Sequence, residues 1–207
     1  MLVFRNKTNR KMLENHEKAG RLRRLSNGIY SSDLETDPAV QIRQNVVRVL
    51  AYLRPGAVIS HRSAILPDFG ASEGLVVVTD SALSENYIHN VPGLVVVATP
   101  GPAPLASDAH LGGIYASSPW RAVLENLEPR RVIRSIGRSK QADTDAIETF
   151  LARNSTSQTL ADGFLQGVAL VVAAAGKWTH EQQFVERLMQ KKCAEAARQP
   201  VFLSPLI

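Results

Sequence analysis

The sequence predicts an α+β protein in three parts, and three features of the chain support this. Residues 1–36 combine a short helical pattern with a basic hairpin pattern. Residues 37–135 mix helical patterns with β-branched runs, which predicts a small α/β domain. Residues 136–207 carry helical patterns only, which predicts a helical C-terminal region.

The first predicted element is a short helix that ends at a glycine. Thr8 or Asn9 is a suitable N-cap, and Met12 and Leu13 supply apolar points of the helix. Gly20 stands where a helix C-terminus favours a residue with positive φ.

A basic hairpin is predicted directly after this helix. Leu22 and Leu25 nearly alternate with arginines, Asn27-Gly28 is a tight-turn signal, and Ile29 begins the return strand. A helix followed at once by a basic hairpin is typical of the second half of a winged helix-turn-helix, whose hairpin lies along the phosphates of DNA. Because only seven residues precede the predicted cap, we expect a partial winged helix.

The charge distribution supports DNA binding by this part of the chain. Residues 1–24 hold eight basic and two acidic side chains, a balance of +6, whereas the remaining residues hold sixteen basic and seventeen acidic ones, a balance of −1. A basic module attached to a neutral partner domain is the charge pattern expected of a nucleic-acid-binding protein. The expected DNA-binding residues are Asn9, Arg10 and Lys11 for base edges or nearby phosphates, Arg21, Arg23 and Arg24 for phosphates, and Asn27 in the turn.

The middle part begins with a predicted polar linker over residues 31–37 and a helix capped by Asp37 that runs to about Arg54. Short strands are predicted at residues 57–60, 74–79, 86–89, 93–99 and 113–116, with one or two helical turns at 61–66. Further helices are expected at residues 118–127, 143–153, 160–175 and 179–198, the last opened by a capping box at Thr179.

No enzyme signature stands out, and we expect no catalytic residues, cofactor or metal. The chain lacks a Gly-x-Ser-x-Gly elbow and a phosphate-binding loop, and residues 19–139 contain no lysine for a restriction-type nuclease core. Asp108, His110, His61 and His89 are metal-ligand types, but polar loop residues are the simpler interpretation. For His61-Arg62-Ser63 we favour a capping serine and a solvated arginine over an anion site.

Three phrases of the chain resemble a known family. EKAGRLRRLSNGIYSS, RVLAYLRPGAVISHRSA and LGGIYASSPWRAVLENLEP look like the bacterial abortive-infection (AbiEi-type) antitoxins and related regulators, over about residues 9–131. The resemblance implies a winged helix followed by a small α/β domain. It also implies repression of the chain's own promoter and neutralisation of a toxin protein within a toxin–antitoxin system.

We therefore expect an antitoxin-like transcriptional regulator that binds DNA and uses the α/β domain for partner contact or as a homodimer interface. The alternative is the regulatory fragment of a Fic-type AMP transferase, because the same arrangement resembles the N-terminal region of some Fic-domain proteins. Their catalytic motif His-Pro-Phe-x-x-Gly-Asn-Gly-Arg is absent here.

A cytoplasmic location is expected, without membrane association. The N-terminus has no signal-peptide pattern, and the most apolar stretch, residues 160–176, is short and interrupted by Asp162 and Gln166. Cys193 is the only cysteine, so no disulfide forms within the chain.

Overall fold

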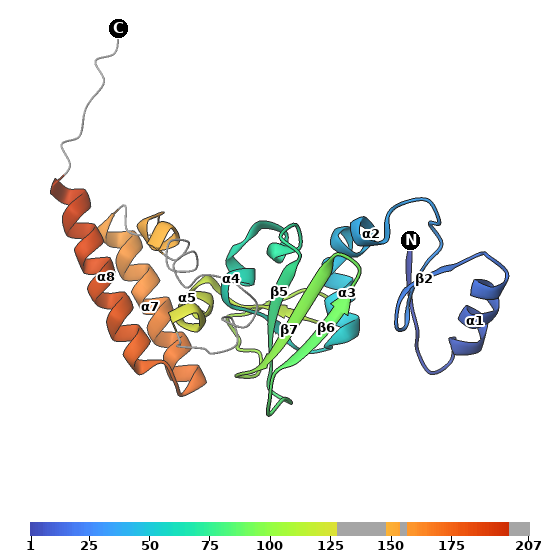
Figure 1. Ribbon diagram of the computed structural model, residues 1–207. Coiled ribbons are helices and arrows are strands. Elements are labelled where there is room, and N and C mark those ends of the chain that lie inside the picture. Colours follow the sequence, from blue (N-terminus) through green and yellow to red (C-terminus); the bar gives the residue numbers. More distant parts are fainter. Residues whose placement is uncertain (128–147, 154–156, 199–207) are drawn as a thin grey trace, which may run out of the picture. The chain divides into compact units, whose positions relative to one another are not determined.

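The computed structural model describes residues 1–127, 148–153 and 157–198, and it shows a mixed α+β protein (Figure 1). The described chain divides into two compact units, Met1–Ser118 and Pro119–Ile207. The predicted domain boundary at residues 135–136, and the predicted helical segment before residue 148, lie outside the described residues.

The N-terminal part of the first unit is a three-stranded antiparallel sheet with one helix. Its elements are β1 (Leu2–Phe4), α1 (Arg10–Lys18), β2 (Arg23–Ser26) and β3 (Ile29–Ser31), and the strand order is β1-β3-β2. The predicted helix and hairpin are both confirmed; β1 was not expected.

Local chemistry explains where α1 ends and where the hairpin turns. Gly20 has a φ of +67°, and the N–H groups of Gly20 and Arg21 donate to the carbonyls of Glu17 and His16, which is a Schellman termination. In the hairpin Gly28 has a φ of +77°, and a Cβ there would lie 2.0 Å from the Tyr52 hydroxyl, so only glycine fits.

The small sheet packs on both faces. Side chains at successive strand positions point to opposite faces, so Leu2 and Ile29 belong to one cluster and Tyr30 to another. The first cluster continues into the buried side chains of α3 (Val46–Leu53), and Phe4 packs against Tyr52 with ring centroids 5.1 Å apart. In the second cluster, Tyr30 packs with Leu13 of α1. The core therefore joins residues on both sides of the predicted boundary at residue 36.

The segment before α2 (Pro38–Gln44) is an ordered connection. The Asp33 carboxylate accepts hydrogen bonds from the N–H groups of Glu35 and Thr36, and the Gln41 amide donates to the Asp33 and Thr36 carbonyls. Asp37 caps α2 as predicted, accepting from Ala39 N and Val40 N at 2.8 and 3.2 Å.

The prediction of one helix through Arg54 is wrong. Two helices, α2 and α3, meet at Asn45, whose φ of −116° is not helical. The Asn45 side chain donates to the Gln41 carbonyl at 2.9 Å, so it bonds to the backbone acceptor that a continuous helix would use.

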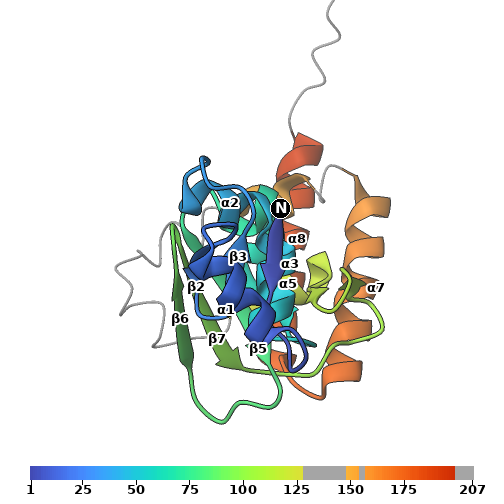
Figure 2. The ribbon, with the colours of Figure 1, turned by 90° about the vertical axis from the view of Figure 1, so that its right-hand side faces the viewer.

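The rest of the first unit is built on a six-stranded mixed sheet of order β6-β7-β5-β4-β9-β8. Its strands are β4 (Val58–Ile59), β5 (Leu75–Asp80), β6 (Tyr87–Val91), β7 (Leu94–Pro100), β8 (Ala109–His110) and β9 (Tyr115–Ala116). The two LVVV runs form β5 and β7, which are parallel neighbours, and β6 lies at the sheet edge beside β7 (Figure 2). All the strands predicted here are present; β8 was not expected.

The predicted turns at residues 61–66 form α4 (His61–Ile65), which is followed by the 3₁₀ helix η1 (Pro67–Gly70). Neither serine caps α4 as predicted: Ser60 makes no capping hydrogen bond, and Ser63 Oγ accepts from Val77 N at 2.9 Å. Arg62 is not simply solvated, because it pairs with Glu73 at 3.1 Å.

The second unit is helical in its described part. It comprises α5 (Pro119–Leu127), a helical segment at 148–153, α7 (Gln158–Ala175) and α8 (Thr179–Arg198). A Cβ on Gly167 would lie 2.2 Å from the Trp120 ring, so glycine allows α5 and α7 to approach closely. Trp178, rather than Thr179, precedes the first turn of α8, and its carbonyl accepts from Gln182 N.

Among the described helices, α7 alone has the length and apolar composition that could span a membrane. It has 18 residues, from Gln158 to Ala175, which is close to the shortest helix that can cross a bilayer. Phe164, Val168 and Val171 of α7 are buried, and α7 contacts both α5 and α8.

Candidate nucleic-acid interface

One anchoring residue determines which face of α1 is exposed. Leu13 is fully buried and packs against Leu22, Tyr30 and partly buried Val3. No other residue of α1 is buried. Since each helical residue advances about 100° around the axis, the opposite face carries the three exposed side chains Lys11, Asn15 and Lys18. The outward face of α1 is therefore mainly polar and basic, with exposed Met12 at its margin.

The loop before α1 is held by two asparagines. The Asn6 carboxamide oxygen accepts from Thr8 N, Thr8 Oγ1 and Asn9 N, each at 2.9 Å. Asn9 accepts from Asn6 N at 2.8 Å and donates to the Phe4 carbonyl at 3.0 Å. These bonds fix the loop that carries exposed Lys7, and they occupy the Asn9 amide, which was expected to read bases.

Arg10, the second residue expected near base edges, is engaged in an ion pair. Its Nε lies 2.9 Å from Oε1 of Glu14, one turn later on α1. The hydrogen bond from Arg10 lowers the pKa of the Glu14 carboxyl and, reciprocally, raises the pKa of Arg10. Both groups are solvent-accessible, so the pair is weak and Arg10 can exchange Glu14 for a phosphate. Lys11 makes no ion pair with any residue in the described part of the chain.

The register of the hairpin places its arginines on opposite faces. Arg24 pairs across the sheet with Tyr30, and Tyr30 with Val3, so this row faces α1. Arg24 is exposed at the end of the row, with Nη2 3.4 Å from the Asn27 carboxamide oxygen. Arg23 is on the other face, half-buried, and its guanidinium donates to the Thr36 carbonyl.

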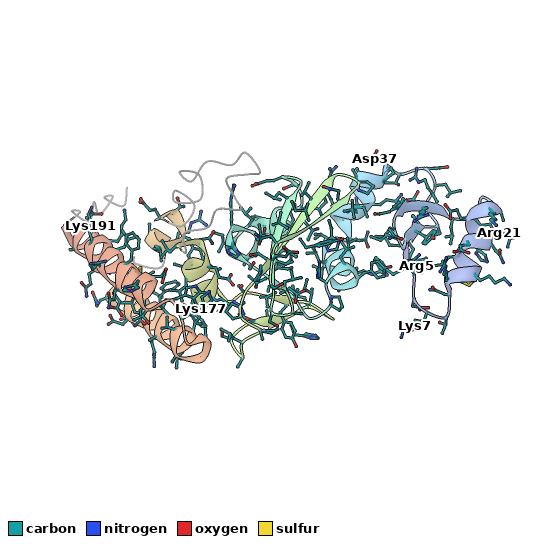
Figure 3. The ribbon with its side chains drawn as sticks, turned by 60° about the horizontal axis from the view of Figure 1, so that its bottom comes forward. Arg5, Lys7, Arg21, Asp37, Lys177 and Lys191 are labelled. Carbon is teal, nitrogen blue, oxygen red and sulfur yellow. The ribbon has the colours of Figure 1, made fainter. Side chains whose placement is uncertain are left out.

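The exposed positive charges of residues 1–24 lie on α1, on the loops that flank it and on β2. Figure 3 labels Arg5 and Lys7 in the loop before α1 and Arg21 in the loop after it. The exposed basic residues of the first 24 are Lys7, Arg10, Lys11, Lys18, Arg21 and Arg24. The two acidic residues of this region, Glu14 and Glu17, are half-buried. We call these six exposed basic side chains the basic surface.

The expected DNA-binding residues did not include Lys7, Asn15 and Lys18, which the structure leaves exposed. The helical period was the available signal, because once Leu13 is recognised as the buried point, Asn15 and Lys18 fall on the opposite side of the helix. Of the seven residues expected to bind DNA, the structure leaves five exposed and two half-buried, namely Asn9 and Arg23.

Two further polar clusters lie in the first unit, one around Arg54 and one at His61. Arg54 donates to His89 Nε2 at 2.9 Å, lies 3.6 Å from the Asp80 carboxylate and stacks 4.7 Å from the Tyr87 ring centroid. Burial, and secondarily the charge of Arg54, lower the pKa of His89. His61 is buried and contacts Ser60 Oγ at 2.8 Å. Across the described ranges, no three His, Cys, Asp or Glu residues gather as metal ligands would.

Comparison with known proteins adds no relative: no protein-family model, curated protein or solved structure matches the chain. The resemblance to the abortive-infection antitoxins therefore stays a prediction from three sequence phrases. Any function has to be inferred from the geometry and charge of the basic surface.

Proposed function

We propose that this chain binds double-stranded DNA through α1 and the β2–β3 hairpin and acts as a cytoplasmic, antitoxin-like transcriptional regulator. The observation that carries the proposal is the basic surface: six exposed cations on one helix, its flanking loops and the adjacent strand. The remainder of the chain has a charge balance of −1, so the attraction for a polyanion is concentrated at one end.

The arrangement of α1 and the hairpin supports this proposal. Leu13 is the one buried residue of α1, and the opposite face, with Lys11, Asn15 and Lys18, is exposed and available to enter a groove. Arg24 extends from the strand row that faces α1, and Arg21 lies in the short connection between helix and strand. A helix in the major groove, with cations of the adjacent hairpin on the phosphates, is the geometry that winged helix-turn-helix proteins use.

The α/β part would supply the second half of such a regulator's function. The sequence resemblance implies neutralisation of a cognate toxin and repression of the chain's own promoter, and the α/β part would serve for partner contact or as a homodimer interface. Neither role requires catalysis.

Fluorescence anisotropy of a labelled duplex from the chain's own promoter region tests the proposal. Six phosphate contacts would make log affinity fall with log salt concentration with a slope of up to about −5. The measurement compares this duplex with a shuffled duplex between about 50 and about 200 mM salt. Absence of binding to either duplex at the lowest salt would refute DNA binding and favour a protein-binding role.

A further inference from the structure

We infer that Asn15 is the residue of α1 that reads DNA sequence, by hydrogen bonding to an adenine edge in the major groove between phosphate contacts made by Lys11 and Lys18. This inference rests on the proposed DNA binding and adds a specificity-determining residue to it.

The position of Asn15 on α1 favours this role. It lies two residues after Leu13, about 200° around the helix from the buried side, and it is exposed. Lys11 and Lys18 lie at about 160° and 140° from Leu13 in the same sense, so all three project away from the sheet. When the outward face of α1 approaches DNA, Asn15 is the uncharged polar side chain at its centre.

The two lysines flank Asn15 along the helix axis. Lys11 and Lys18 are seven residues apart, which is about 10 Å along a helix. Because a recognition helix lies within the major groove, flexible lysine side chains that precede and follow Asn15 along the axis can reach the phosphates that border the groove. Asn15, one turn after Lys11, then faces the base edges.

The amide chemistry of Asn15 suits an adenine edge. A carboxamide offers one acceptor and two donors, which match the N6 donor and N7 acceptor of adenine. Within the part of the chain that the structure describes, the Asn15 side chain makes no hydrogen bond, whereas both functional ends of the Asn9 amide are occupied. Reading a base therefore costs Asn15 no existing contact, while Asn9 would have to break two.

Selection of binding sites from a randomised duplex library tests the inference. The wild-type chain is expected to enrich an adenine at one or more positions, and Asn15→Ala is expected to reduce that preference by roughly 10-fold. Affinity for a shuffled duplex and the slope of log affinity against log salt should not change. Asn15→Gln, which keeps the carboxamide, should retain part of the preference.

Two matched variants separate sequence reading from general binding. Asn90→Ala removes an exposed asparagine on β6 and should change nothing. Lys11→Ala/Lys18→Ala should weaken binding to all sequences alike and make the salt slope shallower by about 2.

Retention of the full sequence preference by Asn15→Ala would overturn the assignment even though DNA binding stands. The same holds for a wild-type chain that binds duplexes without any sequence preference. A wild-type chain that binds no duplex at low salt would instead refute the proposed function itself. Thermal melting of each variant identifies any loss of affinity caused by unfolding.

Discussion

Replacing Arg21, Arg23 and Arg24 in two groups gives the sharpest test of which cations contact DNA in the proposed complex. Read from sequence alone, Arg21, Arg23 and Arg24 are equivalent, and their joint removal should make the salt slope shallower by up to about 3. In the structure only Arg21 and Arg24 are exposed, whereas the Arg23 guanidinium donates to the Thr36 carbonyl. Each phosphate contact contributes about 0.9 to the slope, so Arg21→Ala/Arg24→Ala should change it by about 1.8.

Arg23→Ala should affect stability instead of binding. A hydrogen bond from a charged donor contributes about 1.5 kcal/mol or more, and Arg23 connects β2 to the segment before α2. We expect urea unfolding of Arg23→Ala to show a loss of about that size. The exposed pair Arg21→Ala/Arg24→Ala should unfold within about 0.5 kcal/mol of the wild type.

Anisotropy titrations at four or more salt concentrations give the slopes, and urea titrations give the stabilities of the same preparations. This division of roles is refuted if Arg23→Ala makes the slope shallower by about as much as either exposed arginine does. It is equally refuted if the Arg21→Ala/Arg24→Ala double variant keeps the wild-type slope, because then neither hairpin cation contacts a phosphate.

Three further predictions concern stability. Gly28→Ala would place a Cβ 2.0 Å from the Tyr52 hydroxyl, at a residue whose φ is +77°, so urea unfolding should show a loss of stability of about 2 kcal/mol. Gly20→Ala has the same backbone strain but no atom within 4 Å of the new Cβ, so its loss should be about 1 kcal/mol. Burial and the charge of Arg54 lower the pKa of His89 in the folded chain, so the unfolded chain binds a proton first as the pH falls below about 6.5. The free energy of unfolding should therefore decrease from pH about 7 to about 5, and this decrease should be smaller in His89→Gln. Glu125→Leu should cost about 3 kcal/mol by urea unfolding, because it leaves a fully buried arginine without the carboxylate 2.8 Å from it.

The strands of the larger sheet were predictable because buried strands have a continuous apolar sequence. Residues 75–78 and 94–97 are continuous runs of leucine and valine, as expected of parallel strands covered on both faces. Short runs bounded by glycine and proline left little alternative to a strand. The two-residue strand β8 gave no comparable signal, since Ala109 and His110 are both exposed.

Helix boundaries were less predictable where a polar side chain competes with the backbone. The apolar period of Ile42, Val46, Val49 and Leu50 continues across Asn45, so the sequence indicated one helix. The break comes from a single side-chain hydrogen bond to the Gln41 carbonyl, and periodicity carries no information about such a bond.

In the candidate site, the distribution of charge could be predicted from the sequence, but the exposure of each cation could not. Net charge along the sequence is independent of conformation, so the order of residues alone locates the basic end of the chain. Which cations are available depends on strand register: Arg23 and Arg24 are adjacent, and pairing with Ser31 and Tyr30 turns one toward the core and the other toward solvent.

The exposed face of α1 depends in the same way on a single packing contact. Leu13 is the one buried residue of α1, and Glu14, His16 and Glu17 are half-buried on the same side, so the residues proposed to face DNA are those opposite Leu13 and not those nearest the helix start. A one-residue change in which side chain is buried would rotate the outward face by about 100° and replace Asn15 with a neighbour. The electrostatic attraction would survive that rotation nearly unchanged, since it depends on total charge, whereas the ability to distinguish adenine would not. In the proposed DNA complex, affinity would therefore depend on the composition of the N-terminal segment, and sequence preference on the packing of one leucine.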